Sequence, residues 1–128
     1  AQRADENEIA DLRACIDEFV AAVHSGETGK LMEADYNIHM EIMQISKNNF
    51  LYQMASSFNI IVIANIEGFP KSPPVSIEEH EEMYAAIAGR DAERAERAMS
   101  EHISSSRELI SHRLNGRADS IDYDRERR

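Results

Sequence analysis

The sequence has little of several features that would point to particular classes of protein. It contains one cysteine, Cys15, so no internal disulfide can form and nothing favours an oxidising compartment. No apolar run reaches the roughly 18 residues that a membrane span requires. No basic segment leads into an apolar one, as it would in a signal peptide. We therefore expect a cytoplasmic protein with no membrane partner.

Basic residues are also scarce. Lysine and arginine total 14 against 24 acidic residues, which gives the chain a formal charge of −10. Such a surface repels a phosphate backbone, and no stripe of lysine and arginine offsets the repulsion. This polypeptide is therefore not expected to bind nucleic acid by itself.

Strand signals are missing too, because no segment alternates convincingly and no Asn-Gly or Asp-Gly pair stands between two such segments as a hairpin signal. Apolar residues instead recur at helical spacing. The 128 residues therefore predict a single all-α domain, an antiparallel helical bundle of about five to six helices within residues 1–116. The charged tail, residues 117–128, is expected to fray. The expected helices cover residues 5–24, 29–46, 50–66, 76–89 and 92–114.

Residues with capping or helix-ending chemistry separate these helices. The third expected helix, "FLYQMASSFNIIVIANI", is the most apolar and should be the most buried. The loop after it, "EGFPKSPPV", holds all three prolines. The expected caps and ends are Gly26, Asn49, a capping box of Ser76 with Glu79, Gly89, Asp91 and the pair Asn115-Gly116.

Four ionisable residues fall on the apolar stripes rather than on the polar faces. They are Asp35 and His39 in the second helix, His80 in the fourth and His102 in the fifth. Burying an unpaired carboxylate is costly, so Asp35 requires a partner in the core. The apolar residues that define the three stripes are Leu31, Ile38, Ile42 and Ile45, then Ile77, Met83, Tyr84 and Ile87, then Ala95, Met99, Ile103 and Ile110.

A divalent metal ion would explain the inward aspartate and histidines together. Residues at i and i+4, such as Asp35 and His39, lie about 6 Å apart on one helix face and can bind one ion. Three imidazoles and a carboxylate suit zinc, which we favour, and also nickel, manganese or iron. A purely structural Asp–His cluster remains open as another interpretation. The other two histidines, His24 and His112, are expected at the surface.

Two stretches carry a resemblance to a known family. The first, "DYNIHMEIMQISKN", places Asp35 four residues before His39 and continues with Ser-x-Asn. The second, "EHEEMYAAIAGRDAERAERAMSEHI", places His80 and His102 22 residues apart around a Gly-Arg-Asp turn. Over about residues 5–114 the chain resembles the FCD domain, the C-terminal ligand-binding domain of FadR-subfamily GntR transcription regulators.

The resemblance implies an antiparallel all-α bundle that binds a metal through Asp35, His39, His80 and His102. A small carboxylate effector, an organic or sugar acid, would complete the coordination. Ser106, one helical turn beyond His102 on the same face, is a weaker candidate for touching it. Family members usually form homodimers and bind DNA through an N-terminal winged helix-turn-helix domain, which these 128 residues do not contain. The first helix of the family's bundle is expected to be missing or truncated here.

Two other classes of function stay open, a metalloenzyme in a helical bundle and an interaction domain with a purely structural metal. Catalysis is disfavoured because the chain has neither a Glu-x-x-His nor a His-Glu-x-x-His motif. No spare carboxylate is expected to point inward as a general base. The glutamates nearest the stripes, all expected on the polar side or at its edge, are Glu41, Glu79, Glu81 and Glu82.

Overall fold

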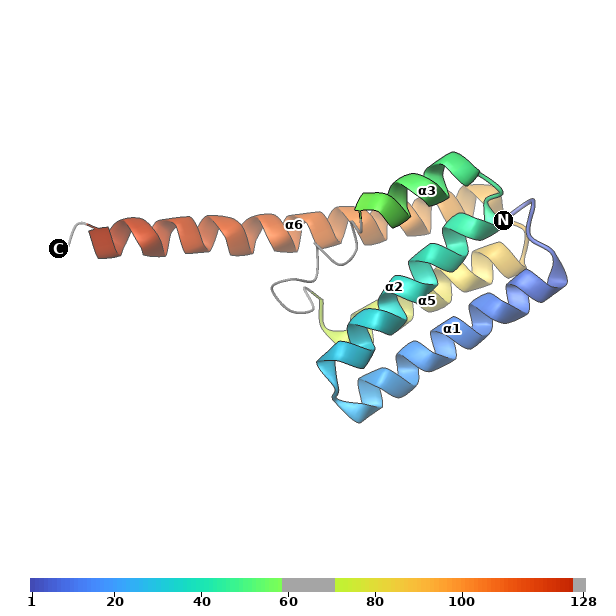
Figure 1. Ribbon diagram of the computed structural model, residues 1–128, viewed down its shortest axis with the longest axis horizontal. Coiled ribbons are helices and arrows are strands. Elements are labelled where there is room, and N and C mark those ends of the chain that lie inside the picture. The colour runs from blue at the N-terminus through green and yellow to red at the C-terminus, as the bar shows by residue number, and fades with distance from the viewer. Residues whose placement is uncertain (59–70, 126–128) are drawn as a thin grey trace.

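The computed structural model of the chain describes residues 1–58 and 71–125 (Figure 1). Within these ranges there are five helices and no strand, which confirms the predicted all-α bundle. No helix in the same ranges is long and apolar enough to cross a membrane. The second half of the third expected helix, residues 59–66, lies outside the described residues. The helices are α1 (Glu6–Ser25), α2 (Thr28–Ile45), α3 (Asn49–Phe58), α5 (Pro73–Ala88) and α6 (Ala92–Arg125).

The bundle is built around α1, which packs against both α2 and α5. Helix α5 also packs against α6, and α2 packs against α3 (Figure 1). Helix α6 is much longer than the others, and its second half runs past the end of the bundle.

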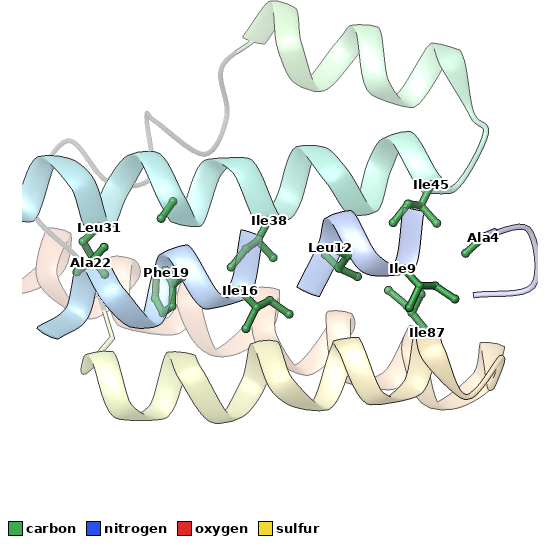
Figure 2. Packing of buried hydrophobic residues seen from close by; sticks show 11 residues of the cluster. Ala4, Ile9, Leu12, Ile16, Phe19, Ala22, Leu31, Ile38, Ile45 and Ile87 are labelled. Atoms are coloured by element: carbon green, nitrogen blue, oxygen red, sulfur yellow. The ribbon is translucent and has the colours of Figure 1, made fainter. Parts of the chain in front are cut away.

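The core follows the apolar stripe of α1 (Figure 2). Leu12, Ile16 and Phe19 are completely buried there, and Ile38 of α2 is completely buried against them. Burying one such side chain contributes roughly 1.5–3 kcal/mol to the stability of the fold. These residues therefore hold α1, α2 and α5 together. The buried apolar residues of the cluster are Ala4, Ile9, Leu12, Ile16, Phe19, Ala22, Leu31, Ala34, Ile38, Ile45 and Ile87.

Several helix ends agree with the sequence. Gly26 ends α1 in the left-handed conformation, with φ of 70°, as expected of a glycine at that place. Asp91 caps α6, because its Oδ1 accepts a hydrogen bond from the Arg94 backbone N–H at 3.0 Å. At the other end of α1, Asp5 forms a capping box with Glu8.

Other ends differ. The cap of α3 is Asn48 rather than Asn49, because the Asn48 Oδ1 accepts from the Leu51 backbone N–H at 3.1 Å. The capping box of Ser76 with Glu79 is wrong, since α5 already begins at Pro73 and Ser76 is buried inside it. A first turn accepts prolines because its N–H groups have no partner within the helix.

The turn between α5 and α6 also departs from expectation. Gly89 keeps a right-handed conformation with φ of −76°, and the left-handed residue is Arg90, with φ of 60°. An added Cβ at Gly89 would lie 3.1 Å from the Ala85 carbonyl oxygen, so close approach of the backbone explains the glycine.

Helix α6 does not end at Asn115-Gly116, as the sequence predicted, but continues to Arg125. A glycine costs a helix only about 1 kcal/mol relative to alanine, so this pair does not have to end one. The predicted stripe of α6 is also wrong at Ile103, which is 55% exposed. Ala98 is buried in α6 although it was not expected on the stripe, and His102 is buried as expected.

Helix α3 is not the most buried helix in its described part. Phe50 is 71% exposed, and Leu51, Tyr52 and Met54 are exposed as well, whereas Ala55 is buried. The helix is apolar enough for a core, but among the described helices it packs mainly against α2. Apolar composition therefore did not predict burial here.

Candidate metal centre

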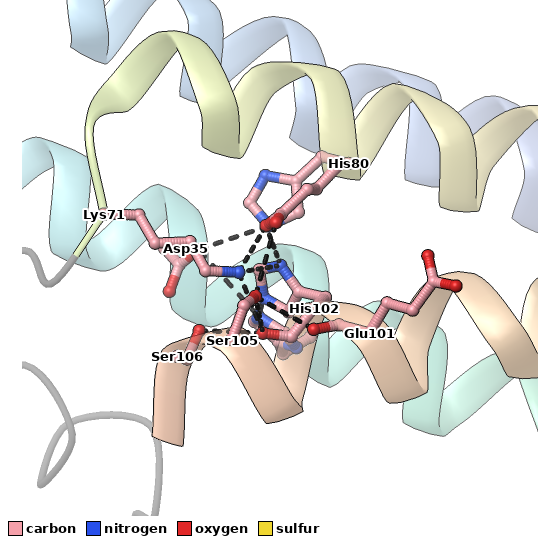
Figure 3. A network of polar contacts seen from close by, with 9 residues as sticks. Asp35, Lys71, His80, Glu101, His102, Ser105 and Ser106 are labelled. Atoms are coloured by element: carbon pink, nitrogen blue, oxygen red, sulfur yellow. Dashed lines mark hydrogen bonds and ion pairs between the residues drawn. The ribbon is translucent and has the colours of Figure 1, made fainter. Parts of the chain in front are cut away.

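Three helices bring the four inward residues together, and Figure 3 labels Asp35, His80 and His102 among them. Helix α2 supplies Asp35 and His39 on one face, α5 supplies His80, and α6 supplies His102. All four are buried, and His80 is completely so. One ring nitrogen from each histidine lies within 4.8 Å of the others, so the three imidazoles could hold a metal ion.

The distances show which atoms face one another. Nε2 of His39 lies 3.1 Å from Nε2 of His102. Oδ1 of Asp35 lies 3.3 Å from Nε2 of His80 and 3.9 Å from Nε2 of His39. The carboxylate thus lies beside the imidazoles, and the prediction that these four residues meet in the core agrees with the geometry.

His80 shows how the core holds the centre. The ring of Phe19 packs edge-on against it, with centroids 4.7 Å apart and planes at 82°. Neither ring nitrogen of His80 makes a hydrogen bond to a described residue, although Asp35 is a charged neighbour of Nε2. Buried polar atoms are normally satisfied, so a nitrogen left without a hydrogen bond fits a metal ligand.

The environment keeps the histidines neutral. Burial, helped by the charges of His102 and Lys71, lowers the pKa of His39 to about 3. Burial, helped by His39, His102 and Lys71, lowers the pKa of His80 to about 2. Burial also lowers the pKa of His102, against the opposing effect of Glu79. Metal ions bind the neutral imidazole, so the site presents its ligands in the required state at neutral pH.

Comparison with known families gives the chain an assignment. The family model of the FCD domain matches residues 1–105, a range that includes Asp35, His39, His80 and His102. The chain belongs to the FCD domain family. No curated protein matches it. Membership supports an effector-binding domain of the GntR type.

Two further residues of this FCD domain belong to the centre, and sequence reasoning missed both. Lys71 is buried, and its Nζ donates a hydrogen bond to the carbonyl oxygen of His102 at 2.8 Å. The same ammonium forms an ion pair with Glu79. Nδ1 of His102 lies 2.7 Å from Oε2 of Glu79. Glu79 was expected on the polar side of its helix or at the edge of that side, and from the edge it nevertheless contacts the predicted ligand His102.

The sequence did not predict Lys71 and Glu79 at the centre, for two different reasons. Lys71 lies in the proline-containing segment before α5, where no periodicity assigns a side chain to a face. Glu79 does sit at the edge of its helix, with 26% of its side chain exposed, but Lys71 and His102 reach it there. Desolvation would raise the pKa of Glu79, yet the hydrogen bonds from Lys71 and His102 lower it overall, so it stays ionised.

The remaining candidates differ in their distance from the centre. Ser106 lies beside it, where its hydroxyl donates to the His102 carbonyl oxygen at 2.9 Å. Its contact with an effector stays a prediction. His24 and His112 are exposed, as expected. Glu81 binds Arg13 through two hydrogen bonds of 2.7 and 2.8 Å and does not approach the histidines as a base would.

Proposed function

We propose that this FCD domain senses a small carboxylate effector through a divalent metal ion bound by Asp35, His39, His80 and His102. The observation that carries the proposal is the convergence of three buried imidazoles with a buried carboxylate from three different helices. The parent protein would be a GntR-type transcription regulator, with DNA contacts made by a separate winged-helix domain. The formal charge of −10 supports DNA contact through a separate domain, because an acidic surface repels the phosphate backbone.

The donor set favours a borderline metal. Three nitrogens and one oxygen suit zinc best, with nickel, manganese and iron as alternatives. When bound, such an ion would compensate the charge of Asp35 and offer further coordination positions to an oxygen ligand. The protein residues would hold those ligands in place, since Phe19 packs against His80 and Lys71 binds the His102 carbonyl oxygen.

The charge of the site supports an anionic effector. Two carboxylates, Asp35 and Glu79, surround the histidines together with one ammonium, Lys71. Adding a dication would leave a single net positive charge in a buried region, where electrostatic interactions are strong. A carboxylate would neutralise it. Effector binding would then favour one packing of the bundle over another and, in a homodimer, change how the DNA-binding domains are presented.

The proposal is tested by the metal content of the purified chain, measured by plasma mass spectrometry. The test variant is Asp35→Ala with His80→Ala. The matched control is His24→Ala with His112→Ala, which removes two exposed ligand-type side chains instead. Circular dichroism establishes that each variant is folded. We expect about one metal ion per chain in the wild type and the control, and a loss in the test variant.

Thermal melts with a panel of carboxylic acids then separate a sensor from a structural metal site. An effector at 100 times its dissociation constant should stabilise the metal-loaded chain by about 2.7 kcal/mol. If chelation destabilises the fold and no acid changes the melt, the metal is structural only. If the wild type cannot be loaded with any of the four metals, the metal site itself is wrong.

A further inference from the structure

His102 is held differently from the other two histidines. Its Nε2 faces His39, and its Nδ1, on the other side of the ring, lies 2.7 Å from Oε2 of Glu79. Lys71 contacts the same carboxylate oxygen and also donates to the His102 carbonyl oxygen at 2.8 Å. The His102 ring, the Glu79 carboxylate and the Lys71 ammonium therefore form one connected cluster on the Nδ1 side of His102, away from the proposed metal.

These contacts decide which nitrogen of His102 carries the proton. An ionised carboxylate has only acceptor oxygens, so a distance of 2.7 Å requires a proton on Nδ1. A neutral imidazole carries one proton, and Nε2 is then left with its lone pair. The ammonium of Lys71 also lies 3.3 Å from Nδ1, and after donating to Glu79 and to the His102 carbonyl oxygen it keeps a third N–H. If Nδ1 accepted that N–H, however, its lone pair would face the ionised Glu79 oxygen at 2.7 Å, so the closer carboxylate favours the proton on Nδ1.

We propose that Glu79, oriented by Lys71, is a positioning residue that fixes His102 with its proton on Nδ1 and its Nε2 lone pair directed toward the metal. The inference rests on the proposed metal site and adds a residue to it. Hydrogen bonds of this kind fix ring orientation and increase ligand basicity, and their loss typically weakens metal binding about 10- to 100-fold. Glu79 therefore acts through His102 and does not bind the ion itself.

The first test needs no variant. Long-range ¹H–¹⁵N correlation spectra of the histidine rings distinguish a protonated nitrogen from one with a free lone pair. In the metal-free wild-type chain we expect the proton of His102 on Nδ1. In the zinc-loaded chain we expect the ion on Nε2. A proton on Nε2 in the metal-free chain, or zinc on Nδ1, would overturn the proposal.

The second test measures zinc affinity by competition with a chromophoric chelator. Glu79→Gln keeps the size of the side chain but replaces the ionised acceptor by a neutral amide. The matched control is Glu78→Gln, the same change at an exposed position of the same helix. We expect zinc affinity to fall about 10- to 100-fold in the first variant and to stay at the wild-type value in the second.

The outcomes separate this inference from the proposed function. If the wild type binds zinc and a folded Glu79→Gln chain binds it equally well, Glu79 has no positioning role and the metal site stands. If the wild type itself binds no zinc, both proposals fail. If Glu79→Gln does not fold, the ring spectra of the wild type still decide the role of Glu79.

Discussion

Acidification of the metal-free chain should destabilise it, because the folded protein holds His39 and His80 in the neutral form. Their pKa values of about 3 and about 2 lie far below the ordinary value of 6.5 that they regain on unfolding. Above pH 6.5 both states are neutral and no stability is lost. As the pH falls from 6.5 toward 3, the unfolded chain binds protons that the folded chain excludes, and stability decreases.

The size of the effect follows from the same values. For each histidine, every pH unit below the unfolded-state pKa and above the folded-state pKa lowers the free energy of unfolding by about 1.4 kcal/mol. At pH 5 this amounts to about 2 kcal/mol for His39 and about 2 kcal/mol for His80. His102 changes stability in the same direction, since burial lowers its pKa too. A loss of about 4 kcal/mol is a large part of the 5–15 kcal/mol that a typical domain has.

The assay is urea denaturation of chelator-treated protein at several pH values between 7 and 5. The free energy of unfolding is extrapolated to water at each pH, and its slope against pH counts the protons taken up. His80→Gln should remove about one proton from that count, because an amide does not titrate. His24→Gln, at an exposed position, should leave the slope unchanged.

Two results would refute this reasoning. If wild-type stability is flat between pH 7 and pH 5, the histidines are not held neutral in the folded chain. If His80→Gln and His24→Gln give the same slope, the proton uptake does not come from the buried cluster. The slope is the decisive quantity because His80→Gln will also change stability at pH 7, where no proton is taken up.

Other perturbations test the scaffold and the ion. Leu12→Ala should destabilise the chain by about 2–5 kcal/mol in urea denaturation, because Leu12 is completely buried. Gly26→Ala should cost about 1 kcal/mol, since φ of 70° strains a residue with a Cβ. Asp5→Ala removes the capping box of α1 and should cost about 0.5–2 kcal/mol. Zinc at 100 times its dissociation constant should stabilise the wild type by about 2.7 kcal/mol, and a chelator should reverse the shift in the melt. Unchanged stability in any of the three variants, or an unchanged melt with zinc, would contradict the corresponding structural feature.

Much of the fold and the main residues of the candidate site could be predicted because helical spacing assigns a residue to a side of its own helix. Asp35 and His39 fall on the stripe of α2, and both are buried. His80 and His102 fall on the inner faces of α5 and α6 in the same way, and each is buried. Helices in a bundle turn those faces toward a common core, so their convergence followed from periodicity.

Contacts made outside the helical period could not be predicted. Lys71 precedes α5 in an irregular segment, and only the fold places its ammonium against the carbonyl oxygen of His102. Glu79 has an unremarkable position on its own helix, and it became part of the centre because α6 brings His102 within 2.7 Å. Spacing specifies a face and not the atoms that another segment brings to its edge.

The sequence by itself thus determined the helical bundle, the inward direction of Asp35 and the three histidines, and the acidic surface. The tertiary structure decided which of two apolar helices is buried, since α1 is covered by α2 and α5 whereas Phe50 of α3 is 71% exposed. It also decided that Glu79 contacts Nδ1 of His102 and that Lys71 pairs with Glu79. The physical reason is that periodicity is a property of one helix, whereas burial and hydrogen bonding depend on which other segments lie against it.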